Sequence, residues 1–356
     1  MQRGLYIHVP FCLSKCPYCD FYSIKYDSET AESYTNAVIR NIKHCGGKFD
    51  TVYFGGGTPF LLWDKIGNIL AYVDTETGAE ITVEANPCTV DAQKLAAVRN
   101  AGVNRISFGV QSLCDDELKA LGRRHNADQA IDAIKIAKKQ GFDNISADIM
   151  LGTPMQTLDS LTHTIQRLSE LPVTHISAYM LKIEENTPFA KAKLEFPDED
   201  EVCSLYLKAV EQLSNSGFDQ YEISNFSKKG FPCRHNLKYW NCEEYLGIGP
   251  AAHSYYKGKR FFVKRDLNTF ISDAYQKISI EDGDPGGYEE YAMLRLRLTE
   301  GLSLSEYGLR GGNVQMLKSM LNTIPREYYF FDRDNVSLTP KGFLVSNMII
   351  CKLLGY

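Results

Sequence analysis

The chain has 356 residues, a formal net charge of −5 and a pI of about 5.9, and 44% of its residues are hydrophobic. This composition is typical of a globular protein with one large domain, or one large and one small domain. It lacks both the basic excess of a nucleic-acid-binding protein and the apolar run of about 20 residues that a membrane span needs. We therefore expect a cytoplasmic protein without a signal peptide and with reduced cysteines.

The first predicted strand, Leu5–Val9, leads into three closely spaced cysteines, Cys12, Cys16 and Cys19. Three thiolates in a CxxxCxxC spacing can hold three irons of a [4Fe–4S] cluster, whereas ordinary ferredoxin sites supply four cysteines. The fourth iron then stays open to another ligand. A zinc site with His8 as fourth ligand is one alternative, and three unrelated thiols are another.

Strand-like runs then alternate with helical patterns. The expected strands are Leu5–Val9, Thr51–Phe54, Ile81–Glu84, Arg105–Gly109, Asn144–Met150 and His175–Met180. The expected helices are Thr30–Lys43, Asp91–Ala101, Asp128–Gln140 and Thr157–Glu170. Asp91 and Asp128 are suitable N-caps, and Gly102 and Gly141 suit helix ends. This alternation predicts an α/β fold with parallel strands, a partial (β/α)6-type barrel whose chemistry lies at the carboxyl ends of the strands.

The pattern changes after Pro188. Asp198–Ser216 is expected to form a helix and Phe218–Phe226 a strand, and aromatic-rich loops are expected over residues 218–258, above all in Pro232–Gly258. Later elements are the short helices Tyr288–Leu298, Ser303–Leu309 and Val314–Leu321, the strands Glu327–Phe331 and Val336–Leu338, and the closing helix Lys341–Leu354. We therefore predict a barrel domain over residues 1–284 and a small winged-helix-like α+β domain over residues 285–356.

Two further signals follow predicted strands. The run from Gly55 to Gly57 comes directly after Thr51–Phe54, and missing side chains there would let the backbone approach a ligand closely. A tight turn without a ligand is the alternative. Glu84 places a carboxylate at the end of the next strand, where a solvated loop charge is the alternative.

With the three cysteines, these signals make the chain resemble radical S-adenosylmethionine (SAM) enzymes over essentially its whole length. Within that superfamily it is similar to the HemN-like branch, which contains oxygen-independent coproporphyrinogen III oxidases, HemW-type heme chaperones and some methyltransferases. The resemblance implies that Cys12, Cys16 and Cys19 hold a [4Fe–4S] cluster whose open iron binds SAM. The SAM contacts that it implies are Gly56, Gly57, Thr58, Glu84, Gln111, Arg123 and Asp148.

Three of the implied contacts leave alternatives open. Arg123 is preferred to its neighbour Arg124 by spacing alone. Tyr6 and Tyr18 stand where the family packs a ring near SAM, and core packing would explain them equally well.

Within the branch, the chain is most similar to the HemW-type heme chaperones. The oxidases carry a fourth cysteine where this chain has Phe21, and an N-terminal extension where this chain has four residues before Leu5. The substrate pocket that the oxidases form is therefore expected to be incomplete in this chain.

Residues 235–240 contain HNxxYW, which resembles a heme-associated signature. The resemblance implies heme contacts by His235, Tyr239 and Trp240, with the His235 imidazole as an axial ligand. Cys233 and His253 are the alternative ligands. A structural histidine and a packed tryptophan in a loop are the other interpretation of the motif.

The implied function is that of a heme chaperone, which binds heme and passes it to heme-accepting, respiratory proteins. The cluster and SAM need not drive net turnover, and an electron donor is a further expected partner. The alternatives are a coproporphyrinogen III oxidase and a HemN-like radical SAM methyltransferase. No nucleic-acid partner is expected, and the sequence leaves a homodimer and a peripheral membrane contact open.

Overall fold

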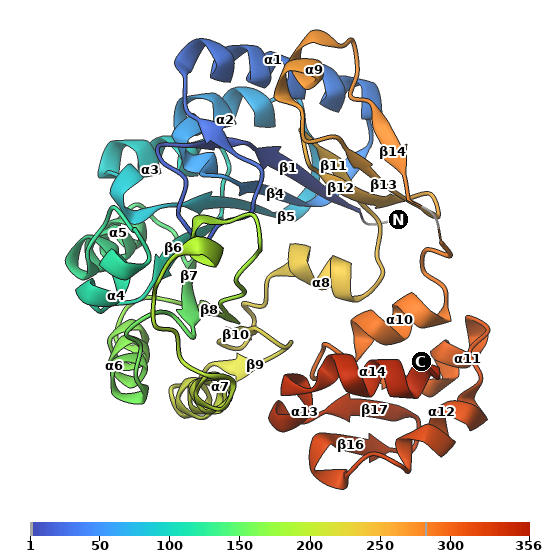
Figure 1. Cartoon of the computed structure of the whole chain (residues 1–356). Helices are drawn as coiled ribbons and strands as arrows, with labels where there is room; N and C mark the ends of the chain where they lie inside the picture. The colour runs from blue at the N-terminus through green and yellow to red at the C-terminus, as the bar shows by residue number, and fades with distance from the viewer. Residues whose placement is uncertain (1–2, 282) are drawn as a thin grey trace.

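The computed structural model describes residues 3–281 and 283–356. Six parallel strands form its centre and match the predicted ones, with the register Tyr6↔Tyr53↔Thr82 running across the first three. They are β1 (Gly4–Val9), β4 (Lys48–Gly56), β5 (Asp74–Ala85), β6 (Arg105–Gln111), β7 (Asn144–Leu151) and β8 (His175–Met180). The sheet curves into a partial barrel with helices around its outside (Figure 1). The predicted α/β fold is confirmed.

The α-helices between these strands are α1 (Ser28–Cys45), α2 (Trp63–Leu70), α3 (Ala92–Asn100), α4 (Asp115–Ala120), α5 (Ala127–Lys139) and α6 (Leu158–Ser169). The four predicted helices correspond to α1, α3, α5 and α6, with ends within two residues of the prediction, whereas α2 and α4 were not predicted. Asp91 caps α3 as predicted, since its carboxylate accepts from the Lys94 amide. The prediction of Asp128 as an N-cap was wrong. Asn126 caps α5 instead, because its side chain and that of Gln129 form a reciprocal capping box.

The region predicted to be loop-rich contains regular structure. It forms α8 (Arg234–Trp240), β11 (Tyr245–Ile248) and β12 (His253–Tyr256). Strand β11 pairs in parallel with β1, and β12, β13 (Lys259–Val263) and β14 (Ile278–Ile280) continue the sheet in antiparallel fashion. Helix α9 (Leu267–Ser272) connects the last two strands. Such short strands, separated by glycine turns, carry too little periodicity to be recognised in the sequence.

The other edge of the sheet also differs from expectation. After α7 (Glu199–Asn215), the predicted single strand Phe218–Phe226 is two short antiparallel strands, β9 (Asp219–Gln220) and β10 (Asn225–Ser227). Strand β10 pairs antiparallel with β8. The complete order of the twelve strands is β14-β13-β12-β11-β1-β4-β5-β6-β7-β8-β10-β9.

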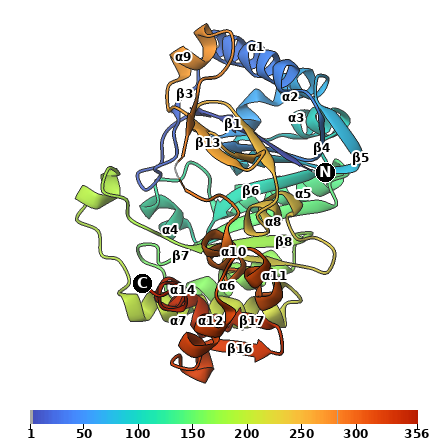
Figure 2. The same cartoon turned by 90° about the vertical axis from the view of Figure 1, so that its right-hand side faces the viewer.

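Residues after 285 build a lobe of helices around a separate three-stranded sheet (Figure 2). Its elements are α10 (Tyr288–Arg295), β15 (Leu302–Ser303), α11 (Leu304–Leu309), α12 (Val314–Leu321), β16 (Tyr329–Asp332), β17 (Asn335–Leu338), α13 (Pro340–Leu344) and α14 (Ser346–Leu354). The predicted closing helix Lys341–Leu354 is interrupted at Val345, which ends α13 and precedes α14.

Alternation along the barrel strands separates an apolar set of residues from a polar set. On β1 and β4, apolar residues such as Leu5, Ile7 and Val52 belong to the buried core. The residues between them include Tyr6, which stacks on Tyr53 of the neighbouring strand and lies within hydrogen-bond distance of His8 on its own strand. The barrel therefore has a polar interior, unlike a core filled with aliphatic side chains.

Helix α8 closes the amino-terminal end of this barrel. A side-chain carbon at Gly4, the first residue of β1, would meet the His235 ring and the Lys238 side chain at 3.0 Å. The Glu80 carboxylate on β5 accepts from the backbone amides of Arg234 and His235 at 3.2 and 3.1 Å. Within the described residues, none of the helices has the length and apolar character needed to cross a membrane.

Candidate functional site

A pocket opens at the carboxyl ends of the barrel strands, where the sequence predicts the chemistry. The predicted residues that line it are Cys12, Cys16, Tyr18, Cys19, Gly56, Gly57, Thr58, Glu84, Gln111, Arg123 and Asp148. They come from the loop after β2 (Phe11–Cys12) and from the ends of β4, β5, β6 and β7 and the loops beyond them. Parallel strands end at one rim of the barrel, which is why residues so distant in sequence meet here.

The three cysteines lie half-buried on one loop of this pocket. Hydrogen-bond donors accompany two of the sulfurs: the Thr58 hydroxyl is 3.8 Å from Cys12 Sγ, and Arg123 Nη1 is 3.6 Å from Cys16 Sγ. Burial raises the pKa of Cys19. Two of the three thiols thus face a polar or positive donor, which suits anionic sulfur ligands.

The zinc alternative does not fit the structure, because His8 has no free ring nitrogen. Its Nδ1 lies 3.1 Å from the Tyr6 hydroxyl, and its Nε2 lies 3.0 Å from the Tyr22 carbonyl oxygen. Among residues 3–281 and 283–356, no three His, Cys, Asp or Glu side chains are placed to hold a single metal ion. A cluster requires a different arrangement, since each thiolate binds a different iron.

The glycines at the end of β4 are required by contacts within the protein. A side-chain carbon at Gly57 would lie 2.6 Å from the carbonyl oxygen of Phe11, on the strand that carries Cys12. Gly56 has a φ of 111°, and its amide donates to Glu84 Oε2 at 3.2 Å. Glycine therefore brings the cysteine loop against the sheet, whereas the sequence suggested close approach to a ligand.

Two partly buried carboxylates, those of Glu84 and Asp148, line the pocket. Glu84 accepts from the Tyr53 hydroxyl at 2.8 Å, and burial followed by the charge of Asp148 raises the pKa of Glu84 to about 7. Asp148 accepts from the Ser107 hydroxyl at 3.1 Å, and burial raises its pKa as well. A cationic ligand would favour the ionised form of both.

Arg123 is the less exposed of two basic residues that line the pocket, the other being Lys15. Its guanidinium donates to Asn86 Oδ1 at 2.7 Å and to the Gly109 carbonyl oxygen at 2.6 Å, while its Nε is buried without a partner. Arg124 is exposed and lies outside this pocket. The structure thus places Arg123, and not its neighbour, among the pocket residues.

Several pocket residues escaped the sequence analysis, among them Lys15, Ser23, Asn86 and Tyr179. Asn86 lines the pocket and also donates to the Thr58 hydroxyl at 3.0 Å, and Tyr179 donates to Gln111 Oε1 at 3.4 Å. Gln111 has a positive φ of 68° at an irregularity in the β6–β7 pairing, a strained backbone of the kind often found at binding sites. Asn86 follows Glu84 at a strand end, and this position was the one available signal.

Tyr6 and the HNxxYW residues lie away from the pocket. Tyr6 is buried inside the barrel, where it stacks on Tyr53 with 6.3 Å between ring centroids. His235 is fully buried, its Nδ1 lies 2.8 Å from the Thr51 hydroxyl, and its Nε2 lies 2.8 Å from the Tyr239 hydroxyl. As placed, neither His235 nitrogen is free to bind iron, so the predicted axial ligation does not fit this structure.

The other heme candidates of this segment are also enclosed. Cys233 is fully buried, and burial raises its pKa to about 12. Tyr239 packs edge-on against Tyr245 with ring centroids 4.5 Å apart, and Trp240 is half-buried at the end of α8. The HNxxYW segment therefore closes the barrel in this structure. This agrees with the other interpretation of the motif, that of a structural histidine and a packed tryptophan.

The fold and the cysteine pocket define the class of protein. A radical SAM superfamily model matches residues 6–168, from β1 to α6. The solved structure of coproporphyrinogen III oxidase (HemN) from Escherichia coli, a radical SAM enzyme, aligns with a TM-score of 0.82. The alignment covers 100% of this chain and 90% of that one at 19% identity, a likeness that shows the fold alone. This is the radical SAM fold.

Sequence relatives identify the family. The heme chaperone HemW of Haemophilus influenzae is 34% identical over 98% of this chain and 96% of its own length. The heme chaperone HemW of Bacillus subtilis is 34% identical over 99% of this chain and 100% of its own length. The chain belongs to the HemW family, as the sequence analysis predicted.

Proposed function

We propose that this protein is a heme chaperone, which binds heme and delivers it to acceptor proteins. The observation that carries the proposal is its similarity, over nearly the whole chain, to relatives named heme chaperone HemW. The respiratory heme proteins and an electron donor are its proposed partners, and the cytoplasm is its proposed location.

The pocket residues are suited to the cofactors of the radical SAM superfamily. In this proposal Cys12, Cys16 and Cys19 hold a [4Fe–4S] cluster, which would supply an electron to SAM bound at its open iron. The unpartnered Nε of Arg123 and the unpartnered hydroxyl of Ser23 are buried polar atoms of the pocket that a polar ligand would satisfy. Arg123 is placed to neutralise the SAM carboxylate.

The remaining pocket residues would orient SAM. Glu84 and Asp148 present carboxylates, one suited to the SAM ammonium group and one to the ribose hydroxyls. Gly56, Gly57 and Thr58 supply backbone and hydroxyl groups at the same rim, Gln111 lies opposite, and Tyr18 offers a ring beside Arg123. Tyr6 does not line the pocket, so it would influence bound SAM only indirectly, through its contact with His8.

A porphyrinogen oxidase is the second candidate, because the fold is that of HemN. Phe21 stands at the position of the oxidases' fourth cysteine, and it lines the pocket with 65% of its surface exposed. An apolar ring there cannot act as a ligand or a proton donor. We therefore favour the chaperone over the oxidase, and the similarity to the HemW relatives favours it over the methyltransferase.

The test compares two substrates on one preparation. Anaerobically reconstituted protein is titrated with hemin and, separately, incubated with coproporphyrinogen III, SAM and a reductant. Stoichiometric heme binding, transfer of heme to an apo-cytochrome and no protoporphyrinogen IX are the expected results. Decarboxylation of coproporphyrinogen III by this protein would replace the proposal with the oxidase.

A further inference from the structure

Strands β11–β14, which we call the sheet extension, carry a histidine, His253, whose surroundings differ from those of His235. In β12 and β13, His253 pairs with Phe262, and Tyr255 pairs with Arg260. These side chains share one face because they alternate along their strands. His253 begins β12 beside Gly247 of β11, at the carboxyl end of the barrel strands.

One ring nitrogen of His253 is occupied and the other is free. Its Nδ1 lies 3.1 Å from Glu281 Oε1, and 61% of the side chain is exposed. The ring stacks on Phe262 with 5.5 Å between centroids and an interplanar angle of 27°. A carboxylate on one nitrogen and an aromatic ring beside the imidazole fix its orientation, and Nε2 has no hydrogen-bond partner among residues 3–281 and 283–356.

This arrangement is that of a histidine prepared for a metal. Metal-binding histidines commonly donate their second N–H to a carboxylate, which fixes the tautomer and makes the other nitrogen a stronger donor. Nothing else among residues 3–281 and 283–356 completes a group of three ligands for a bare ion. A single strong imidazole donor instead suits an iron whose equatorial positions a porphyrin already fills.

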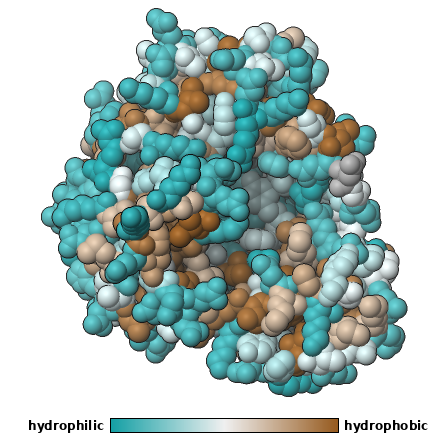
Figure 3. Space-filling model, viewed as in Figure 1, coloured by the Kyte–Doolittle hydropathy of each residue, from teal (hydrophilic) through white to brown (hydrophobic). Residues whose placement is uncertain are grey.

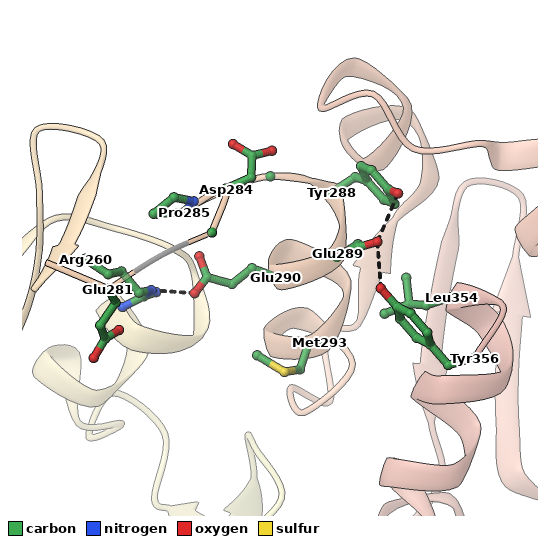
Figure 4. Close-up of a pocket in the computed structure, with 12 residues that line it drawn as sticks. Arg260, Glu281, Asp284, Pro285, Tyr288, Glu289, Glu290, Met293, Leu354 and Tyr356 are labelled. Atoms are coloured by element: carbon green, nitrogen blue, oxygen red, sulfur yellow. Dashed lines mark hydrogen bonds and ion pairs between the residues drawn. The ribbon is translucent and has the colours of Figure 1, made fainter.

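The charges around Glu281 indicate the direction in which the propionate groups of a bound porphyrin would point. Glu281 also lines a pocket of about 450 Å³ between the sheet extension and the C-terminal lobe, together with Asp284, Glu289 and Glu290. Figure 4 shows Arg260 paired with Glu290, and Tyr288 and Tyr356 both bonded to Glu289, while no residue drawn there bonds Glu281. This acidic pocket would repel propionates.

Basic residues lie in the other direction, toward the cysteine loop. Lys264 and Arg265 follow Phe262 on the chain, and 62% of the Arg265 side chain is exposed with its guanidinium 3.7 Å from Asp20. His253 begins β12, and the Arg265 guanidinium lies beside Asp20, the residue after Cys19, so both residues stand near the barrel mouth. Guanidinium and ammonium groups there suit two propionates.

We propose that His253, oriented by Glu281, is the axial ligand of the bound heme iron, with the propionates toward Lys264 and Arg265. The inference rests on the proposed chaperone function and places its cargo beside the mouth of the barrel, on the side of the cysteine loop. His235 then has a purely structural role at the closed end.

The test is a hemin titration of the full-length wild type and four variants, with resonance Raman spectra of the ferrous complexes. We expect His253→Ala to weaken hemin binding about tenfold or more, which corresponds to about 1.4 kcal/mol, and to lose the iron–imidazole stretching band. Glu281→Gln should keep this band but move it to lower frequency, because a neutral amide polarises the imidazole less than a carboxylate. His44→Ala is the matched control, since His44 is also exposed and stacked on a ring, that of Tyr275.

The outcomes separate this inference from the function on which it rests. Restoration of the band in His253→Gly by added imidazole would support direct ligation. Wild-type affinity and an unchanged band in His253→Ala would overturn the assignment while leaving the chaperone intact. A wild type that binds no hemin would overturn both.

Discussion

The two ends of the barrel are built from similar residue types but differ in access. At the amino-terminal end, α8 covers the interior, and the Glu80 carboxylate is used by the amides of Arg234 and His235. At the carboxyl end, Glu84 and Arg123 line an open pocket beside three thiols. Residue type alone thus does not indicate a ligand site, since the covering elements decide which polar groups can meet one.

The histidines make the same comparison sharper. His235 belongs to the more suggestive sequence motif, yet both its nitrogens are bonded inside the protein, and burial lowers its pKa to about 3. His253 lies in an unremarkable segment, yet it is exposed and bonded to a carboxylate through one nitrogen only. Substitutions at the two ends should therefore have different effects. Those at the open end should weaken ligand binding, and those at the closed end should lower the stability of the fold.

The largest expected effect is at the open end, in the cysteine loop. Cys16→Ala should abolish the iron–sulfur absorbance of anaerobically reconstituted protein, because one iron loses its thiolate. Cys88→Ala is the matched control, since Cys88 is exposed and lines a small cavity next to Cys16. Iron and sulfide content per chain provides the measurement. A Cys16→Ala protein with a full cluster would remove Cys16 from the site.

The next effect tests how the open end is held together. Gly57→Val should weaken both the cluster and its response to SAM, because the side chain would collide with the Phe11 backbone next to Cys12. The perturbation of the reduced cluster's EPR spectrum by SAM is the measurement. Gly67→Ala is the control, since the added carbon would meet only the Ala101 side chain, at 3.3 Å. A normal SAM response in Gly57→Val would mean that the loop does not depend on this contact.

At the closed end, His235→Ala should act on stability alone. The substitution leaves the Thr51 and Tyr239 hydroxyls buried without their partner, which should lower the free energy of unfolding by about 2–4 kcal/mol. Heme affinity should not change. Urea denaturation and a hemin titration of the same variant measure the two quantities. A variant with wild-type stability but weak heme binding would reverse the roles that we assign to the two histidines.

Much of the fold could be predicted because its signals are local. The six parallel strands and their helices follow from strand-length apolar runs, helical periodicity and caps such as Asp91. Strands β11–β14 could not be predicted, since each has three to five residues and gains its identity only by pairing with β1 or with each other.

The candidate site also has a part that could be predicted from local sequence signals and a part that could not. The pocket residues follow strand ends, so an ordered set of parallel strands brings them together, and most were predicted. The enclosure of His235 could not be, because it depends on Thr51 and Glu80, which are more than 150 residues distant. The His253–Glu281 pair also joins β12 to the residue that follows β14, and these two strands are not neighbours in the sheet.

The smallest expected effect is a pH dependence that originates at the open end. Burial raises the pKa of Glu84 from 4.5 to about 7, so the folded state holds this proton more tightly than the unfolded chain does. The Glu84 contribution to the free energy of unfolding should therefore be complete below about pH 4.5 and should be lost as the pH rises to about 7. The loss should be on the order of 2 kcal/mol.

Glu84→Gln mimics the protonated carboxyl and should remove this loss. Burial also raises the pKa of Glu222 to about 7 and raises that of Asp148, so the wild-type curve contains three such groups. The difference between wild type and variant isolates Glu84 together with its interaction with Asp148. Urea unfolding of both proteins across this pH range measures that difference. Glu76→Gln is the control, because Glu76 is exposed and paired only with the exposed Lys48. If wild type and Glu84→Gln lose stability in parallel between pH 4.5 and 7, the pocket carboxylate is ionised throughout, and the open end is more hydrated than its burial indicates.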